Sequence, residues 1–168
     1  IDLFNFITKT NLDSFIKLDF EILKDKTFKF KEINLENGNN RFISKNLKLN
    51  NKLDLLDLES VNFEFKNNHG LNNKIQISKI KNNFIIKGEL LDGTSLLSKF
   101  LNEDKDKVNI LKEKKTKIIV KIKKLYLNKK DYVNNLSGDI TFRKGEIFDL
   151  DLLSYFPNKE ALIFNIKL

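Results

Sequence analysis

Pairs of acidic side chains two residues apart are the first arrangement in this sequence that could do chemistry. Asp149 and Asp151 form one pair, and Asp104 and Asp106 form another. Acid–base catalysis needs two carboxylates held in a pocket with separated pKa values. These pairs instead occur in an alternating stretch and in a highly charged stretch, and the second lacks the other ligands of a calcium loop. We therefore predict that both pairs are solvated and not catalytic.

Residue types that serve most other catalytic and metal-binding chemistry are scarce. The chain has no Cys, which excludes disulfides, thiol nucleophiles and thiolate metal sites. His69 is the only His, so His-rich metal sites and Ser-His-Asp triads are excluded, and its place beside Gly70 predicts a turn residue. The six Gly are scattered and form no phosphate-binding loop. We expect a protein without enzymatic activity, metal or other cofactor.

The net charge of +8 would suit a nucleic-acid partner, but the kind and distribution of the basic residues argue against one. Only Arg41 and Arg143 among the 31 basic residues are Arg, the side chain best suited to bidentate contacts with phosphates and bases. The Lys residues are spread along nearly every segment. We interpret them as solvated faces rather than an anion-binding surface, and predict no nucleic-acid partner.

The elements that must position these residues are strands, because apolar and polar residues alternate with a period of two. Residues 16–22 alternate cleanly, and the phase slips by one residue between 28–30 and 33–35, which predicts either a bulge or a break between two elements. Stretches rich in Asn and Gly, at 37–40 and 67–70, predict turns between strands. Residues 53–58 are apolar but have no clear phase.

One short helix is expected at about 94–102, capped by Asp92-Gly93-Thr94, followed by a charged surface loop from Asn102 to Lys117. A doubly wound α/β fold would need a helix between successive strands. The predicted fold class is therefore mainly β, an antiparallel, curved, meander-type sheet with one short helix. One face of the sheet should be rich in Phe and Ile, and the other in Lys and Asn.

The two ends of the chain suggest a segment of a longer protein. It begins at Ile1 without a signal-peptide pattern, and it ends within an alternating stretch at Leu168, whereas strands normally stop at turn residues. No apolar stretch approaches the roughly 20 residues of a membrane-spanning helix. We expect residues 1–168 to be a single β segment of an elongated structure.

Three stretches of the second half, residues 84–97, 125–140 and 145–152, resemble the C-terminal region of the AsmA-like family, most closely its very long members of YhdP type. Residues 84–97 (Phe-Ile-Ile-Lys-Gly-Glu-Leu-Leu-Asp, then Ser-Leu-Leu) resemble its strand, Gly-x-x-Leu-Asp turn and short helix. Residues 125–140 resemble its next pair of strands, with a Leu-x-Gly-x-Leu pattern that here reads Leu136-x-Gly138-x-Ile140. Residues 145–152 are similar to the returning strand. The resemblance covers 84–168, and 1–83 is compatible with it.

The resemblance implies a periplasmic protein anchored in the inner membrane, outside this segment. In that family a long curved β-sheet is thought to carry phospholipid toward the outer membrane on its apolar face, without catalysis or a metal cofactor. The implied partners are phospholipid acyl chains, neighbouring β segments of the same parent protein and the membrane. The lipid-binding candidates are the residues that alternate most cleanly: Phe63, Phe65, Ile75, Ile77, Phe84, Ile86, Ile118, Val120, Ile122, Ile140, Phe142, Phe164 and Ile166.

An alternative function fits the same alternation. A structural or adhesive β-sandwich from a repeat-containing surface protein would also need one apolar face, but that face would close against a second sheet. A lipid carrier would instead leave the face open and curved.

Overall fold

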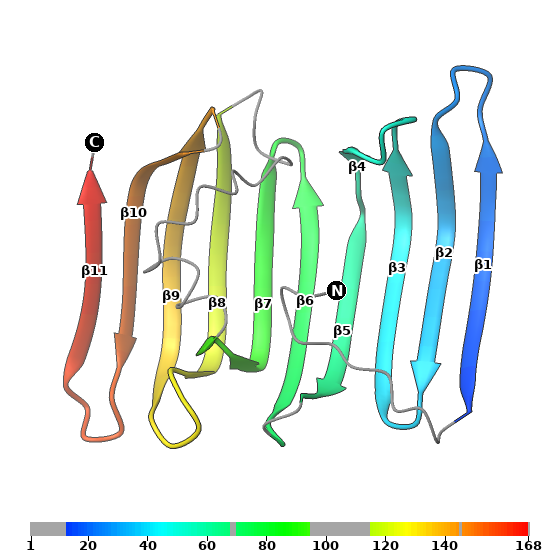
Figure 1. Ribbon diagram of the computed structural model, residues 1–168. Helices are drawn as coiled ribbons and strands as arrows, with labels where there is room; N and C mark the ends of the chain where they lie inside the picture. The colour runs from blue at the N-terminus through cyan, green and yellow to red at the C-terminus, as the bar shows by residue number, and fades with distance from the viewer. Residues whose placement is uncertain (1–12, 68–69, 95–114, 145, 168) are drawn as a thin grey trace.

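The computed structural model describes residues 13–67, 70–94, 115–144 and 146–167, and most of them lie in β-strands. Within these residues eleven strands form a single sheet, and Figure 1 shows them side by side. The strands are β1 (Ser14–Ile22), β2 (Phe28–Asn37), β3 (Asn40–Leu49), β4 (Leu55–Asp57), β5 (Ser60–Lys66), β6 (Asn72–Ile80), β7 (Asn83–Asp92), β8 (Thr116–Tyr126), β9 (Tyr132–Arg143), β10 (Glu146–Tyr155) and β11 (Ala161–Lys167).

The strands follow one another across the sheet in chain order, from β1 at one edge to β11 at the other, and the short β4 pairs with β3 beside this path. All neighbours are antiparallel except β7 and β8, which run parallel with Asn83 opposite Lys117. The predicted curved, mainly antiparallel sheet is confirmed. The parallel pair was not predicted, because a period of two is the same whichever way a strand runs.

The predicted helix at 94–102 lies outside the described residues apart from its first residue, Thr94. The cap expected there is present, since the Thr94 backbone N–H and hydroxyl both donate to Asp92 Oδ1, at 3.0 and 2.5 Å. Most of the loop predicted from Asn102 to Lys117 also lies outside the described residues. Its last two residues were assigned wrongly, because β8 already begins at Thr116.

The phase slip in the sequence of β2 corresponds to a real irregularity in the sheet. The register between β1 and β2 shifts between Asp19 and Phe20, so Lys31 is an extra residue on β2. The bulge keeps the apolar residues of β2 on one face, because Phe30 stacks on Phe20 with 5.6 Å between ring centroids. Of the two possibilities that the phase slip left open, the structure has the bulge, because β2 continues through it.

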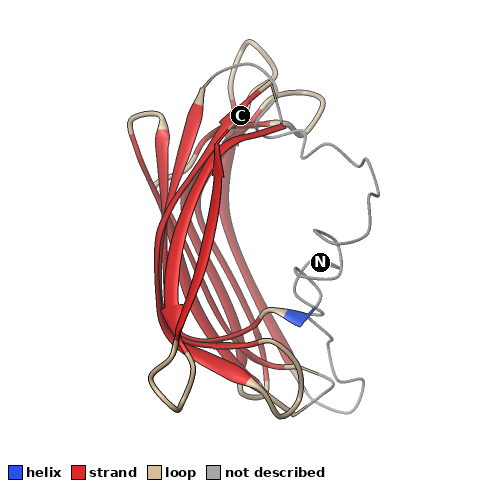
Figure 2. Cartoon of the chain, turned by 90° about the vertical axis from the view of Figure 1, so that its left-hand side faces the viewer, coloured by secondary structure: helices blue, strands red, loops and turns tan. Residues whose placement is uncertain are grey.

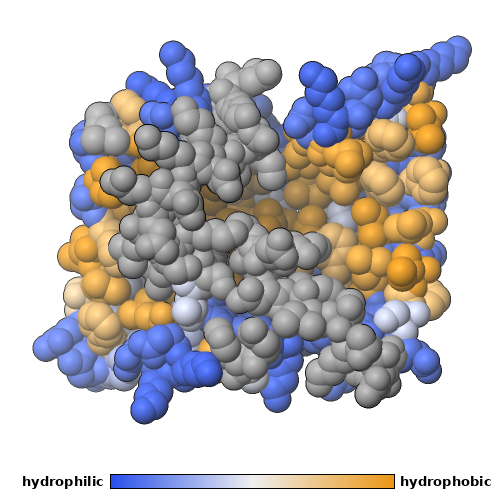
Figure 3. Space-filling model, viewed as in Figure 1, coloured by the Kyte–Doolittle hydropathy of each residue, from blue (hydrophilic) through white to orange (hydrophobic). Residues whose placement is uncertain are grey.

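The sheet is bowed along its strands, and Figure 2 shows its concave side facing right. This is the side seen in Figure 3, where, toward both flanks of the view, hydrophobic side chains lie between hydrophilic ones that gather toward the strand ends. Two clusters of buried side chains lie on this side, joined through the partly buried Ile77. They consist of Leu58, Val61, Phe63 and Phe65 in one, and Ile75, Leu91, Val120, Ile122 and Leu136 in the other.

Two hairpins of the sheet share one turn geometry, in which a Lys takes the left-handed conformation that Gly or Asn usually supplies. Lys26 (φ 62°) and Lys159 (φ 70°) each precede the residue that restarts pairing. In the turn between β10 and β11, the Phe156 N–H donates to the Glu160 carbonyl at 2.9 Å. This bond fixes which residues of β11 face β10. Within the described residues, no helix has the length and apolar content needed to cross a bilayer.

Candidate functional site

The concave face carries one continuous row of side chains that crosses ten strands, here called the central row. Residues directly opposite each other in neighbouring strands point to the same face of a sheet, so the register traces the row. Eight of its ten residues are apolar, the other two are Ser and Gly, and none is charged. From β1 to β11 the central row is Leu18, Ile33, Ser44, Val61, Ile77, Ile86, Val120, Gly138, Leu152 and Phe164.

Two further rows without charged residues flank the central row. One contains Ile16, Leu35, Phe42, Phe63, Ile75, Gly88, Ile122 and Leu136. The other contains Phe84, Ile118, Ile140, Leu150 and Ile166 and ends at β7, because Lys79 lies opposite Phe84 on β6. Rings contact edge to face where the first row crosses from β3 to β5, with 5.0 Å between the centroids of Phe42 and Phe63. The rows together make a broad apolar surface that can adsorb hydrocarbon without a polar anchor.

Exposure on this face rises from the middle of the sheet to its edges. Val120 and Ile122, in the middle, retain only 6% and 4% of their accessible surface. Leu18 and Phe20 on β1 each retain 51%, and Phe164 on β11 retains 44%. Large apolar side chains this exposed in neighbouring positions mark a surface suited to an apolar partner.

One ion pair lies at the rim of the concave face, where β4 meets β6. Lys79 is opposite Phe84, and its Nζ donates to Asp57 Oδ1 at 2.9 Å and to the Leu56 carbonyl at 3.1 Å. The hydrogen bond from Lys79 lowers the pKa of Asp57 below its ordinary range, with smaller help from the Leu58 backbone N–H and from nearby Lys charges. The Lys79 ammonium is mostly buried and its charge is paired with the Asp57 carboxylate, so the ion pair holds β4 against the sheet.

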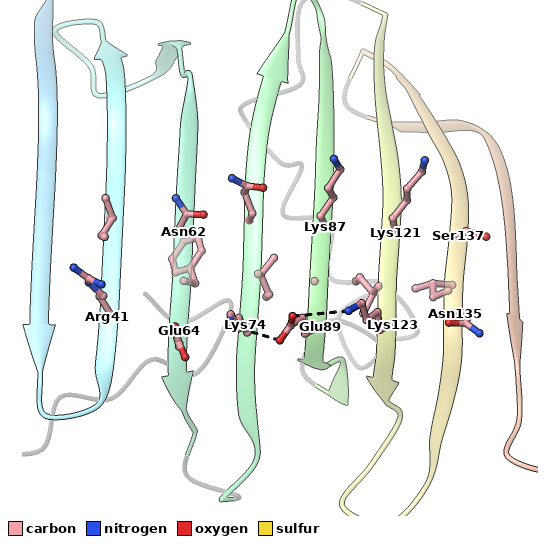
Figure 4. Close-up of a pocket in the computed structure, with 17 residues that line it drawn as sticks. Arg41, Asn62, Glu64, Lys74, Lys87, Glu89, Lys121, Lys123, Asn135 and Ser137 are labelled. Atoms are coloured by element: carbon pink, nitrogen blue, oxygen red, sulfur yellow. Dashed lines mark ion pairs between the residues drawn. The ribbon is translucent and has the colours of Figure 1, made fainter.

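The opposite, convex face is polar, and Figure 4 shows a shallow depression of about 760 Å³ on it. Glu89 lies between Lys74 and Lys123, at 3.6 and 3.8 Å, and all three side chains are more than half exposed. Lys87 and Lys121 lie directly opposite each other on β7 and β8. Such solvated ion pairs contribute little binding energy. The depression therefore lacks the enclosed, convergent polar groups of a ligand site.

Of the two acidic pairs considered in the sequence, the structure describes only one. Asp149 and Asp151 on β10 lie opposite Thr141 and Asp139 of β9, on the polar face. Asp139 in turn pairs with Lys117 at 2.7 Å. The second pair, Asp104 and Asp106, and the single His69 lie outside the described residues. Among the residues that are described, no three acidic or His side chains gather as a metal site would require.

The structure brings all thirteen candidate residues to the concave face. Nine belong to the three rows of the central sheet, and Phe164 and Ile166 extend two of these rows onto β11. Phe65 lies opposite the buried Asn73, and Phe142 lies opposite Thr116, each on the same face as its row neighbours. That these residues bind lipid stays a prediction.

The candidate set omitted the N-terminal quarter of the same face. Ile16, Leu18, Phe20 and Ile22 on β1 alternate as cleanly as any chosen strand, and they are more exposed than the chosen residues in the middle of the sheet. Leu136, Leu150 and Leu152 were also omitted. The alternation in β1 was visible in the sequence, but the phase slip in β2 had to be bridged before the two strands could be assigned one face.

The concave face, with rows of apolar side chains and no charge in them, is thus the candidate site. Comparison of the chain with models of protein families, with curated proteins and with solved structures found no match.

Proposed function

We propose that this chain is a segment of a membrane-anchored periplasmic protein that carries phospholipid between the inner and outer membranes along its apolar concave face. The observation that carries the proposal is the central row, which crosses ten strands without one charged residue. The compartment and the membrane anchor rest on the resemblance of residues 84–168 to the AsmA-like family.

The size of the face suits acyl chains. Ten strands spaced about 4.8 Å apart give a row roughly 43 Å long. The acyl chains of one leaflet occupy about 15 Å, half of the roughly 30 Å hydrocarbon core of a bilayer. The row is therefore longer than a lipid tail, which suits a path along which a lipid moves better than a pocket that holds one lipid in place.

The energetics suit movement as well. Each CH₂ of an acyl chain removed from water is stabilised by about 0.8 kcal/mol, wherever along an apolar surface it lies. The rows repeat similar aliphatic and aromatic contacts from strand to strand, so a tail sliding across the sheet exchanges one contact for a similar one. A carrier needs a binding free energy that changes little along its path, because one very tight site would trap the lipid.

The alternative is a structural or adhesive β-sandwich with no lipid role. A sandwich buries its apolar face against a second sheet. Here the described strands belong to one sheet, and Leu18 and Phe20 remain half exposed on its concave face. These two observations favour an apolar ligand over a packed second layer.

Photo-crosslinking in the full-length protein, in cells, tests the proposal, and β1 supplies a matched pair of positions. Phe20 lies on the concave face and Phe15 on the convex face of the same strand, with 51% and 55% of their surface exposed. A photoreactive residue at position 20 should form adducts that mass spectrometry identifies as phospholipid, and one at position 15 should not.

Two further positions extend the test to the middle of the sheet. Phe84 lies on the concave face of β7, and Lys87 points from the same strand toward the convex face. Phospholipid adducts at positions 20 and 84, without adducts at positions 15 and 87, would support transport. Adducts with protein only, or equal phospholipid at positions 15 and 87, would reject the proposal and favour the structural alternative.

A further inference from the structure

The concave face of β1, β2 and β3 is bounded at one end of the strands by a row of polar side chains, here called the amide row. It consists of Ser14, Asn37 and Asn40, which lie opposite one another. The Asn37 Nδ2 donates to the Ser14 hydroxyl at 2.8 Å, and the Asn40 Oδ1 accepts the Lys66 N–H at 3.0 Å. Asn37 and Asn40 are only 4% and 5% exposed. These amides are therefore buried and hydrogen-bonded within the fold, and they offer little to a ligand.

Four apolar rows separate the amide row from the other end of the same three strands. On β1 they run from Ile16 to Ile22, which is about 20 Å at roughly 3.4 Å per residue. One leaflet of a bilayer has about 15 Å of hydrocarbon and roughly 5–7 Å of head-group region. The apolar rows are therefore about as deep as one layer of lipid. They consist of Ile16, Leu35 and Phe42; Leu18, Ile33 and Ser44; Phe20, Phe30 and Leu47; and Ile22, Phe28 and Leu49, with Ser44 as their single polar member.

Exposed lysines lie beyond the apolar end of these strands. Strands β1, β3 and β6 run in the same direction, so the turns that follow them lie at one end of the sheet, the upper end in Figure 1. Asp25 and Asp54 lie in the same turns, which keep a net charge of +2 (4 − 2 = 2). The turn between β2 and β3, beside the amide row, consists of Gly38 and Asn39 and is uncharged. Within the described residues no ion pair neutralises the four lysines of the upper turns, here called the lysine turns, which are Lys24, Lys26, Lys52 and Lys81.

We infer that a phospholipid lies along these strands, with its tails on the four apolar rows and its phosphate at the lysine turns after β1 and β3, and that the face favours head groups with a net negative charge. The inference rests on the proposed function. Exposed ammonium groups attract anionic head groups, each weakly and in a way that salt screens. The buried amide row has no charge with which to compete. A lipid in this orientation can pass from strand to strand and keep its phosphate on the same side.

The orientation is a property of the face and not of the edge of the sheet. A strand that pairs with β1 uses the backbone groups of β1, which lie in the plane of the sheet, and the side chains of Ile16 and Ile22 still point to the concave side. The inference therefore holds whichever segment pairs with β1.

Photo-crosslinking at two matched positions tests the orientation. Ile16 and Ile22 lie on the concave face of β1 at opposite ends of the apolar rows, and they are 63% and 61% exposed. A photoreactive residue replaces each in turn in the full-length protein, in cells, and tandem mass spectrometry locates the lipid carbon to which it attaches. We expect attachment at position 22 to the glycerol or to the first carbons of an acyl chain, and at position 16 to carbons near the terminal methyl.

The outcomes separate this inference from the proposed function. Phospholipid attached in the reverse order, or over the same carbons at both positions, would overturn the orientation and leave the transport proposal standing. Absence of phospholipid at both positions and at position 20 would remove the proposed function and this inference with it.

A second measurement tests the head-group preference. Lys24→Gln combined with Lys26→Gln removes two positive charges from the turn after β1. The matched control, Lys129→Gln combined with Lys130→Gln, removes two from the turn between β8 and β9 at the other end of the sheet. With the photoreactive residue at position 20, adducts are read for phosphatidylglycerol, which is anionic, and phosphatidylethanolamine, which is zwitterionic. The ratio of the first lipid to the second should fall on the order of tenfold in the Lys24 and Lys26 variant and stay unchanged in the control.

An unchanged ratio in the Lys24 and Lys26 variant, or an equal fall in both variants, would overturn the preference. Phospholipid adducts at position 84 in both variants serve as the check on folding, because they show that the middle of the sheet still forms the apolar face.

Discussion

Gly138 occupies the one position of the central row that no other residue can fill. Its φ is +147°, and a Cβ placed on it would lie 1.9 Å from the Asp151 carbonyl oxygen on β10. Both the backbone conformation and the close approach of β10 therefore require Gly. The Gly of the Leu136-x-Gly138-x-Ile140 pattern thus has a structural explanation that does not depend on any family.

We expect Gly138→Ala to lower the free energy of unfolding by about 2–4 kcal/mol, from the clash and the backbone strain together. Gly70→Ala is the control, since its φ is also positive (+79°) but its Cβ would meet only the end of the Lys66 side chain, at 3.8 Å. It should cost about 1 kcal/mol. Urea denaturation of both variants measures the difference, and equal losses would contradict the close approach of β9 and β10.

Two buried serines on the sheet differ in one respect that mutation can measure. Ser44 in the central row is 1% exposed, and its hydroxyl has no hydrogen-bond partner among the residues that the structure describes. Ser154 is fully buried and its hydroxyl donates to the Leu162 carbonyl at 3.4 Å. Ser44→Ala should raise the free energy of unfolding or leave it unchanged, and Ser154→Ala should lower it by about 0.5–1 kcal/mol. Thermal unfolding of the two variants decides; a clear loss for Ser44→Ala would show a hydrogen bond at that hydroxyl.

At the scale of an element, β4 is held by its pairing with β3 and by one ion pair to β6. β4 has three residues and pairs only with β3, and Lys79 of β6 holds it through Asp57 and the Leu56 carbonyl. Because the pKa of Asp57 is lower in the folded chain than in the unfolded one, the pair stabilises the fold above the ordinary Asp pKa of about 3.9. That contribution is lost as the pH falls through the lowered value.

We expect hydrogen exchange in β4 to accelerate as the pH is lowered below about 4, beyond the intrinsic change, because protonated Asp57 no longer holds Lys79. Asp57→Asn should remove this pH dependence and leave β4 less protected at neutral pH. Asp139→Asn, which breaks an ion pair between β9 and β8, is the control and should leave the pH response of β4 unchanged. An unchanged response in Asp57→Asn would show that another group anchors β4.

The elements show where sequence reasoning succeeds and where it stops. Alternation identified the apolar face because successive side chains of a strand point to opposite faces of the sheet. The phase slip before Ile33 indicated the bulge. Alternation stopped at residues 53–58, where Leu53 adopts a left-handed conformation (φ 63°) and no period of two survives. Alternation also could not predict that β8 runs parallel to β7. The direction of pairing depends on the path of the chain between the two strands, and the order of apolar and polar side chains is the same for both directions.

Alternation also predicted which residues lie on the face of the candidate site, but it did not predict how exposed they are. All thirteen candidates share the concave face, because alternation and register agree in the middle of the sheet. The candidates include no residue of β1, although its side chains are the most exposed part of the concave face. Alternation gives the face to which a side chain points, and it does not give how much of that side chain is exposed.

For the whole molecule, β1 should be where an acyl chain is most easily gained and lost, because its concave-face side chains are the most exposed. Leu18→Gln combined with Phe20→Gln should weaken binding of a fluorescent fatty acid by about tenfold, since two apolar contacts worth about 0.8 kcal/mol each are lost. Phe15→Gln, on the opposite face, should bind normally. Fluorescence titration measures both, and equal weakening by the two variants would place the ligand elsewhere.

The parallel seam between β7 and β8 has a consequence for how the chain folds. Paired residues across it are 34 positions apart (117 − 83 = 34), whereas the other neighbouring strands meet through short connections. Strands β1–β7 and strands β8–β11 can therefore each form by local pairing. Joining the two groups has the larger entropy cost, because it closes the longer loop. We expect the seam to form last, so pulse-labelled amide protons of Ile86 and Ile119 should gain protection after those of Ile43 and Leu152. The sheet would then begin as two separate kinetic units that become one only in the final step.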